Sequence, residues 1–143
     1  QIRTLVEGYN MSPQEGECIY RRDILGFAES ELGQRMKRAA QDKKLYREQP
    51  FVMKVDRKEL DASWSGDETV LVQGIIDAYF LEGEDIVLVD YKTDRIARGE
   101  ENKLIERYKT QLEDYASALE RMLHKKVKQK YIYSFALRKE LLL

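Results

Sequence analysis

The chain has 143 residues, of which 43% are hydrophobic and 36% charged, and its 25 basic and 26 acidic side chains leave a formal charge of −1. This length predicts a single domain over residues 1–143, and the balanced charge excludes a whole-molecule field that would draw in DNA or an anionic membrane. The one cysteine, Cys18, excludes an intramolecular disulfide and an iron–sulfur cluster, and favours a cytoplasmic setting.

The first part of the chain, residues 1–46, is predicted to be helical. Residues 1–7 have the pattern of a helix that starts further upstream, so we expect the chain to be an N-terminally truncated fragment of a longer protein. Ser12 is placed to cap the start of a second helix and Asp23 that of a third. Residues 31–41 have the periodicity of a further helix, with Arg and Lys on its polar side.

A sheet is predicted to begin at residue 47, where the hydrophobic period changes from that of a helix to two. Small and turn-forming residues at 61–67 indicate a hairpin loop, which separates this first strand from a second strand at 69–81. A short turn then leads into a third strand at 86–92. The three strands are therefore expected to form an antiparallel meander.

The longest helix is predicted at residues 102–122, where apolar side chains recur every three or four positions. Alternating residues at 127–135 indicate a fourth strand. Because a strand, helix, strand order requires a crossover, the third and fourth strands are expected to be parallel. The sheet and helix core, residues 47–143, is thus predicted to be an α/β fold with a mixed sheet flanked by helices.

Two acidic residues end apolar strand-like runs: Asp77 lies near the end of residues 70–80, and Asp90 directly follows residues 86–89. A charge removed from water at such a place is costly unless it is paired or holds a metal. Lys92 projects on the same face as Asp90, because side chains two apart on a strand share a face. Two carboxylates suit Mg²⁺ or Mn²⁺ and a nearby lysine can orient a water, so these three residues form a candidate catalytic metal site.

The same residues also allow a purely structural interpretation. Asp90 and Lys92 would then form an ion pair at a sheet edge, and Asp77 would cap a turn. The pairing register, which decides whether the two acids meet, is not fixed by the sequence. Asp94 shares the face of Asp90 if the third strand continues, and is otherwise an exposed loop acid.

Further features near the two acids favour the catalytic interpretation. Glu48 opens the first strand, and Gln111 and Tyr115 lie one helical turn apart on the long helix. Gly74, three residues before Asp77, leaves room for a backbone or a nucleic-acid strand to approach closely.

Three segments resemble the ordered motifs of RecB-family nucleases within the PD-(D/E)XK superfamily: residues 74–77 (GIID), 90–94 (DYKTD) and 111–115 (QLEDY). Two more, residues 31–36 and 46–51, are similar to the nuclease domains of AddA-type helicase–nuclease subunits. The resemblance covers residues 24–135. It implies a restriction-endonuclease-like fold and the exonucleolytic hydrolysis of DNA in double-strand break repair.

The resemblance also implies a role for each matching residue. Asp77, Asp90 and the backbone carbonyl of Tyr91 would hold Mg²⁺ or Mn²⁺, and Lys92 would orient the attacking water. The implied partners are DNA, the rest of an AddA-like chain and an AddB-like subunit.

The matching residues on the long helix, Gln111 and Tyr115, would contact DNA or brace the site. Glu48 would position its neighbours. The role of Asp94 is left open by the resemblance.

One departure from the pattern concerns histidine. Relatives of this kind usually carry a metal-ligating histidine on an upstream helix, and no histidine precedes Asp77 here. We expect that helix to lie before residue 1, and the fragment alone to bind metal poorly and to cut DNA slowly or not at all. The only histidine, His124, follows the long helix beside a lysine run and is expected at the surface. No phosphate-loop motif is present, so no ATP site is expected in this fragment.

Two alternatives stay open. The fold would serve as a DNA-holding or subunit-docking module without chemistry if the missing histidine has no upstream counterpart. Another PD-(D/E)XK enzyme, such as a restriction or Cas4-like nuclease, would share the site, although Cas4-like members resemble iron–sulfur proteins and this chain has one cysteine. Cutting polarity, strand preference and the choice of metal do not follow from the sequence.

Overall fold

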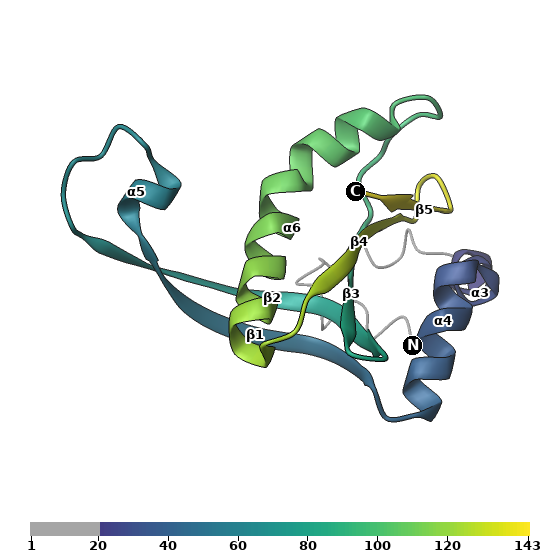
Figure 1. The fold of residues 1–143 in the computed structure, drawn as a ribbon. Coiled ribbons are helices and arrows are strands. Elements are labelled where there is room, and N and C mark those ends of the chain that lie inside the picture. The colour runs from purple at the N-terminus through teal and green to yellow at the C-terminus, as the bar shows by residue number, and fades with distance from the viewer. Residues whose placement is uncertain (1–20) are drawn as a thin grey trace.

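A five-stranded mixed sheet with helices on both faces forms the centre of the fold, which the computed structural model describes for residues 21–143 (Figure 1). The strands follow one another in the sheet in chain order: β1 (Leu45–Asp56), β2 (Thr69–Glu82), β3 (Asp85–Lys92), β4 (Val127–Ser134) and β5 (Lys139–Leu142). The helices are α3 (Arg21–Glu29), α4 (Glu31–Gln41), α5 (Arg57–Leu60) and α6 (Glu101–Leu123). The predicted α/β class is therefore confirmed, and the sheet is consistent with a restriction-endonuclease-like fold.

The helices expected at residues 1–7 and after Ser12 lie outside the described residues. Asp23 is in the first turn of α3 rather than at its N-cap. Ser30 caps α4, because its hydroxyl accepts a hydrogen bond of 3.0 Å from the backbone N–H of Gly33. Among residues 21–143, none of the helices combines the length and the apolar character that crossing a membrane requires.

The strand topology agrees with the sequence. β1, β2 and β3 form the predicted antiparallel meander, and β3 pairs in parallel with β4 across the crossover helix α6. β1 begins at Leu45, two residues before the predicted start, so the helical part of the chain is correspondingly shorter. Two elements have no counterpart in the predictions: α5 after β1, and β5, which pairs antiparallel with β4. Both have four residues, too few for a periodic pattern to be recognised.

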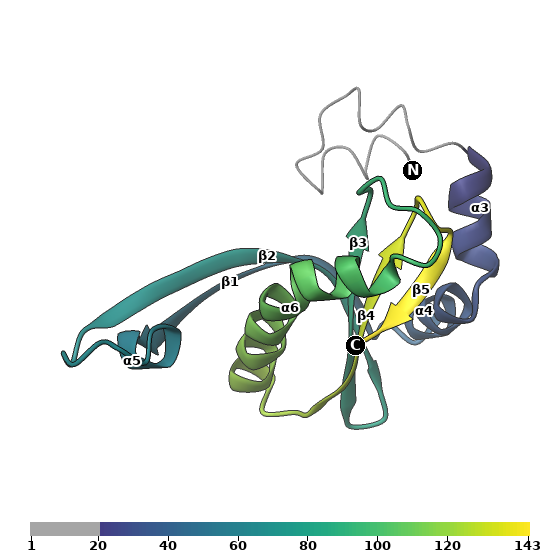
Figure 2. The same ribbon diagram turned by 90° about the horizontal axis from the view of Figure 1, so that it is seen from above.

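Helix α6 packs on one face of the sheet, and α3 and α4 lie on the other (Figure 2). On the α6 side the core contains leucines of the helix and alternate residues of β3: Leu104, Leu112, Leu119, Ile86 and Leu88. On the α4 side it contains the remaining residues of β3 and the apolar face of the helix: Val87, Val89, Leu32, Met36 and Ala39. β3 is thus buried on both faces, as its continuous apolar run predicts.

The strands β1 and β2 continue past the rest of the sheet as a hairpin arm that carries α5 at its tip (Figures 1 and 2). At the tip, the guanidinium of Arg57 lies over the ring of Trp64, 3.5 Å from its centroid. Arg121 of α6 donates a hydrogen bond of 3.1 Å to the carbonyl of Lys54. The contact of Arg121 ties the arm to the long helix.

In strand β2, the alternation of side chains between the two faces of the sheet is interrupted close to Asp77. Positions 74 and 80 have the same parity, and on a regular strand they would face the same way. A side chain at Gly74 would point at Tyr115 on α6, yet Phe80 lies under Arg35 on α4. The alternation is therefore broken between these two positions, and Asp77 lies in the middle of the break.

The neighbouring strand β1 reverses at the same level. Leu45 packs with the core on the α4 side, whereas Phe51, of the same parity, makes an edge contact with the ring of Tyr115 on α6. Between them Glu48 has a φ of 50°, in the left-handed region. The register on either side places Glu48 opposite Asp77. Because both strands reverse together, the ladder keeps its register while the side chain of Asp77 is redirected.

Candidate active site

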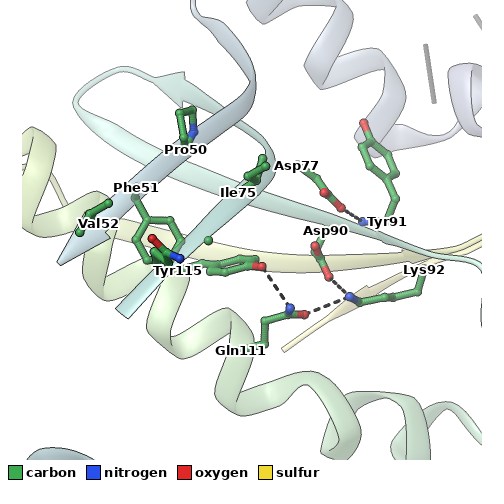
Figure 3. Close-up of a pocket in the computed structure, with 12 residues that line it drawn as sticks. Pro50, Phe51, Val52, Ile75, Asp77, Asp90, Tyr91, Lys92, Gln111 and Tyr115 are labelled. Carbon is green, nitrogen blue, oxygen red and sulfur yellow. Dashed lines mark hydrogen bonds and ion pairs between the residues drawn. The ribbon is translucent and has the colours of Figure 1, made fainter. Parts of the chain in front are cut away.

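A pocket of about 650 Å³ lies where β2 and β3 meet α6 (Figure 3). Its walls come from four elements, β1, β2, β3 and α6. The lining residues are Pro50, Phe51 and Val52 of β1, Gln73, Gly74, Ile75 and Asp77 of β2, Asp90, Tyr91 and Lys92 of β3, and Gln111 and Tyr115 of α6. All the residues that the resemblance assigns to the site, except Glu48, line this one pocket.

The two acids are brought together by the pairing of β2 with β3. Ala78 pairs with Val89, so the antiparallel register places Asp77 opposite Asp90. One carboxylate oxygen of Asp77 accepts a hydrogen bond of 3.0 Å from the backbone N–H of Tyr91. The structure thus gives the register that the sequence left open, and it favours the meeting of the two carboxylates.

The electrostatics of this pair are those of two buried carboxyls. Burial, and then the neighbouring Asp90 carboxylate, raise the pKa of Asp77 to about 8 against the opposing effects of the Tyr91 N–H and Lys92. The side chain of Asp90 is almost fully buried. A second negative charge at this place is therefore strongly disfavoured unless a cation accompanies it.

The ammonium of Lys92 is held by groups from β3 and α6. Its Nζ lies 2.8 Å from Oδ2 of Asp90 and donates a hydrogen bond of 3.0 Å to Oε1 of Gln111. Both contacts are drawn in Figure 3. The ion pair of the structural interpretation is therefore present, but it lies inside the pocket and not at an outer sheet edge.

Gln111 connects the lysine to the tyrosine one helical turn later. Its Nε2 donates a hydrogen bond of 3.1 Å to the hydroxyl of Tyr115. Burial, and then the charges of Asp90 and Asp77, raise the pKa of Tyr115 to about 12, so this hydroxyl stays protonated at neutral pH. The structure places Gln111 and Tyr115 beside the acids and the lysine, and their role in contacting DNA or bracing the site stays a prediction.

The structure explains the glycine at position 74 differently from the sequence. A Cβ at this position would lie 2.9 Å from the ring of Phe51 and 3.3 Å from that of Tyr115. The space that the glycine leaves is therefore filled by these two rings, and not by a backbone or a nucleic-acid strand. Its absent side chain lets Tyr115 reach the pocket.

The donors present fit a divalent cation that prefers oxygen. Within residues 21–143, no donor makes a hydrogen bond of good geometry with the buried Oδ2 of Asp90, although Lys92 is close enough for an ion pair. Asp77 and Asp90 supply carboxylate oxygens, and the carbonyl of Tyr91 stays a predicted third ligand. The same described range contains no group of three or more His, Cys, Asp or Glu side chains arranged to hold a metal.

Three residues considered in the sequence lie outside the pocket. Glu48 is exposed within β1 rather than at its start, and it does not line the pocket. His124 is exposed at the C-terminal end of α6, with a φ of 52°, as expected for a surface residue. Asp94 follows the end of β3, so it is a loop residue, but it is not a free surface acid: it accepts hydrogen bonds from Tyr108 and Arg107.

Tyr108 contacts the candidate site from outside the pocket, and the sequence did not single it out. Its ring lies under the ammonium of Lys92, 3.9 Å from Nζ to the ring centroid. The sequence indicates it only as one of the apolar positions of the long helix. Its position one turn before Gln111, on the helix face that also carries Tyr115, is the signal that could have identified it.

The chain is similar to segments of AddA proteins, the A subunits of ATP-dependent helicase/nucleases. It is 41% identical to that of Clostridium perfringens (strain SM101 / Type A), over 99% of this chain and 12% of the relative. The protein of Acetivibrio thermocellus is 43% identical over 94% of this chain, and that of Clostridium beijerinckii 39% identical over 99%. The chain thus spans about 12% of the length of such relatives. No family model matches it.

These relatives confirm the resemblance to AddA-type subunits that the motifs indicated. The similarity extends over nearly the whole chain, beyond the motifs themselves. The names refer to proteins about eight times longer than the matched segment, so the activities that they state belong to those longer proteins.

Proposed function

We propose that this chain is the nuclease domain of an AddA-type helicase–nuclease and that it hydrolyses DNA phosphodiesters exonucleolytically, with a metal-activated water. The observation that carries the proposal is the convergence of Asp77, Asp90 and Lys92 in one pocket. The names of the relatives, which include both a helicase and a nuclease, support it. The proposed setting is the processing of double-strand breaks in the cytoplasm, with an AddB-like partner subunit.

The proposed chemistry assigns the two acids to metal binding. Asp77 and Asp90, together with the carbonyl of Tyr91, would hold Mg²⁺ or Mn²⁺. When bound, such an ion lowers the pKa of a coordinated water and offsets charge on the phosphate. Since burial and mutual repulsion make the ionised acid pair unfavourable, the pair is suited to a divalent cation.

The other pocket residues would act on the water and on the DNA. Lys92 is fixed by Asp90 and Gln111, and its ammonium can donate a hydrogen bond to the attacking water or offset charge on the phosphate. Tyr115 accepts a hydrogen bond from Gln111, which leaves its own O–H as a donor for a phosphate oxygen.

The test is the degradation of linear DNA by the full-length subunit in complex with its partner. We expect Mg²⁺- or Mn²⁺-dependent degradation that Asp90→Ala abolishes while ATP-dependent unwinding continues. A matched control is Asp67→Ala, because Asp67 is an exposed acid on the hairpin arm, outside the pocket. Degradation that needs no metal, or that survives Asp90→Ala, would contradict the proposal.

The second candidate is a module that holds DNA or docks a subunit without chemistry. It is favoured by the absence of a three-donor metal group among residues 21–143 and by the ion pair between Lys92 and Asp90. Calorimetric titration of the full-length protein with Mn²⁺ separates the two. Binding that is lost on Asp77→Asn supports the nuclease, whereas no Asp77-dependent binding supports the module.

A further inference from the structure

The ammonium of Lys92 has a third contact besides Asp90 and Gln111. It lies over the face of the Tyr108 ring, 3.9 Å from the ring centroid, and only 15% of the lysine side chain is exposed. A cation over an aromatic face is attracted by the electron-rich ring, more strongly when both are shielded from water. The ring therefore limits the directions that the ammonium can take.

The orientation of this ring is itself fixed. The Tyr108 hydroxyl lies 2.8 Å and 3.0 Å from the two carboxylate oxygens of Asp94, and Arg107 donates to the same carboxylate at 2.7 Å. Asp94 follows β3 by two residues, and Tyr108 is in the second turn of α6. The hydrogen bond thus joins the loop that follows the candidate metal ligands to the helix that bears Gln111.

Tyr108 does not line the pocket. Its contact with the candidate site is made through Lys92, whose ammonium lies over its ring. Lysine is a flexible residue with four rotatable bonds, and holding its ammonium in one place costs side-chain entropy. A ring that is already fixed by Asp94 reduces the number of positions open to that ammonium.

We propose that Tyr108, oriented by Asp94, is a positioning residue that holds the Lys92 ammonium at its position between Asp90 and Gln111 in the pocket. The inference rests on the proposed nuclease function and adds to it a residue pair that lies outside the pocket. Asp94 acquires a role here as the anchor of the ring.

A purely structural role is the alternative, because Tyr108 also packs against the core on the α6 side. Two variants separate the roles. Tyr108→Leu keeps apolar volume in the core and removes the aromatic face, whereas Tyr108→Phe keeps the face and removes the hydrogen bonds to Asp94. If only packing matters, the two variants behave alike. If the aromatic face at position 108 matters, Tyr108→Phe keeps most of the activity that Tyr108→Leu loses.

The first measurement is steady-state DNA hydrolysis by the full-length subunit in complex with its partner. For Tyr108→Leu we expect kcat to fall about tenfold with KM unchanged, and for Tyr108→Phe a fall of about twofold. Tyr131→Leu is the matched control, because this tyrosine also faces a cation, Arg35 at 5.7 Å, but lies outside the pocket. Equal losses for leucine and phenylalanine, or full activity of Tyr108→Leu, would overturn the inference.

The second measurement does not depend on nuclease activity. The same complex is treated briefly with an amine-acylating reagent, and the modification of Lys92 is measured by mass spectrometry relative to the exposed Lys103. Because an ammonium held by these contacts reacts slowly, we expect Tyr108→Leu to increase the acylation of Lys92 several-fold, and Tyr108→Phe, which keeps the ring but loses its contact with Asp94, to increase it about twofold. Unchanged acylation in Tyr108→Leu would overturn the inference.

The two measurements also separate this inference from the proposed function. If Asp90→Ala leaves DNA degradation intact, the proposed nuclease site is wrong, and the acylation of Lys92 still decides whether Tyr108 holds it. If Asp90→Ala abolishes degradation and Tyr108→Leu does not reduce it, the nuclease proposal stands and the positioning role is wrong.

Discussion

The carboxyl of Asp77 is buried beside that of Asp90, and its protonation changes with the folding of the chain. Burial, followed by the Asp90 carboxylate, raises its pKa to about 8, whereas an aspartate in an unfolded chain has a pKa of about 3.9. Between these two pH values the folded state binds a proton that the unfolded state does not. The stability that this proton provides is complete below about pH 4 and is lost as the pH rises through about 8.

This linkage predicts the behaviour of Asp77→Asn, which imitates the neutral carboxyl. Without metal, we expect the variant to be more stable than the wild type by an amount that is small near pH 4 and largest above about pH 8. Urea unfolding of the two chains in the presence of a chelator, over a series of pH values, measures the difference. Added Mg²⁺ is expected to stabilise only the wild type, and only at high concentration, because the isolated fragment is expected to bind metal poorly. A difference that does not change with pH would contradict the raised pKa.

The packing around Gly74 leads to a second prediction. In Gly74→Ala the new Cβ would press on the rings of Phe51 and Tyr115, at 2.9 Å and 3.3 Å. Overpacking of this kind costs about 1–3 kcal/mol, and we expect a loss of that size in the free energy of unfolding, measured with urea. Displacement of Tyr115 is also expected to slow DNA hydrolysis.

The control for this prediction is Gly26→Ala. A Cβ at Gly26 meets no atom within 4 Å, and the residue is in helix α3. Alanine is favoured over glycine inside a helix by about 1 kcal/mol, so this substitution is expected to stabilise the chain. If Gly74→Ala is also neutral or stabilising, the rings do not depend on the glycine.

The long periodic helices and strands could be predicted from the sequence, and the short or irregular ones could not. Helix α6 and strand β3 have patterns long enough to identify them, and both are found within one residue of the prediction. The paired face reversal at Glu48 and Asp77 has no such pattern, because a glutamate in the left-handed region is not marked by its sequence. That reversal redirects Asp77 into the pocket.

The candidate site could likewise be predicted in part. The acids and the lysine stand out because charges are unusual at the ends of apolar runs, and Gln111 and Tyr115 follow from the motif spacing. The spacing places Tyr108 on the helix face of Gln111 and Tyr115, but it does not distinguish a site residue from core packing, which is what a tyrosine at an apolar helix position normally indicates. Its contact with Lys92 depends on how α6 lies across the sheet, which is a property of the tertiary structure.

Helix α4 is attached to the sheet through the side chain of Arg35. Arg35 donates two hydrogen bonds to the carboxylate of Glu82 on β2, at 2.7 Å and 3.0 Å, and others to Gln129 and Tyr131 on β4. We expect Arg35→Met to lower the free energy of unfolding by about 1–3 kcal/mol, because the partners lose a charged donor. Urea unfolding measures the loss, and Arg38→Met, at an exposed position of the same helix, is expected to change little.

The pH dependence of this attachment provides a check. The hydrogen bond from Arg35 is the main reason that the pKa of Glu82 is lowered to about 2. The stabilisation is therefore complete above about pH 4.5 and lost as the pH falls through about 2. The difference between wild type and Arg35→Met should shrink over that range, and a constant difference would mean that the arginine acts through packing alone.

Among residues 21–143, several basic side chains are paired with acidic ones, and the acidic and basic residues of the chain nearly balance. Lys125 lies 2.6 Å from Glu84, Lys128 lies 3.0 Å from Glu82, and the formal charge of the chain is −1. A nuclease must nevertheless hold a polyanion, and the two acids of the pocket oppose a phosphate that approaches without metal. We therefore expect most of the cationic contacts with DNA to come from outside this chain, which spans about 12% of its relatives.

The salt dependence of DNA binding tests this expectation. Each phosphate neutralised contributes about −0.9 to the slope of log affinity against log salt, so the isolated chain is expected to bind weakly with a slope shallower than about −3. The full-length subunit with its partner should bind more tightly and show a steeper slope, and fluorescence anisotropy with labelled DNA measures both. A slope for the isolated chain as steep as that of the complex would show that its own lysines and arginines supply the contacts, because counterion release depends on how many phosphates are neutralised and not on net charge.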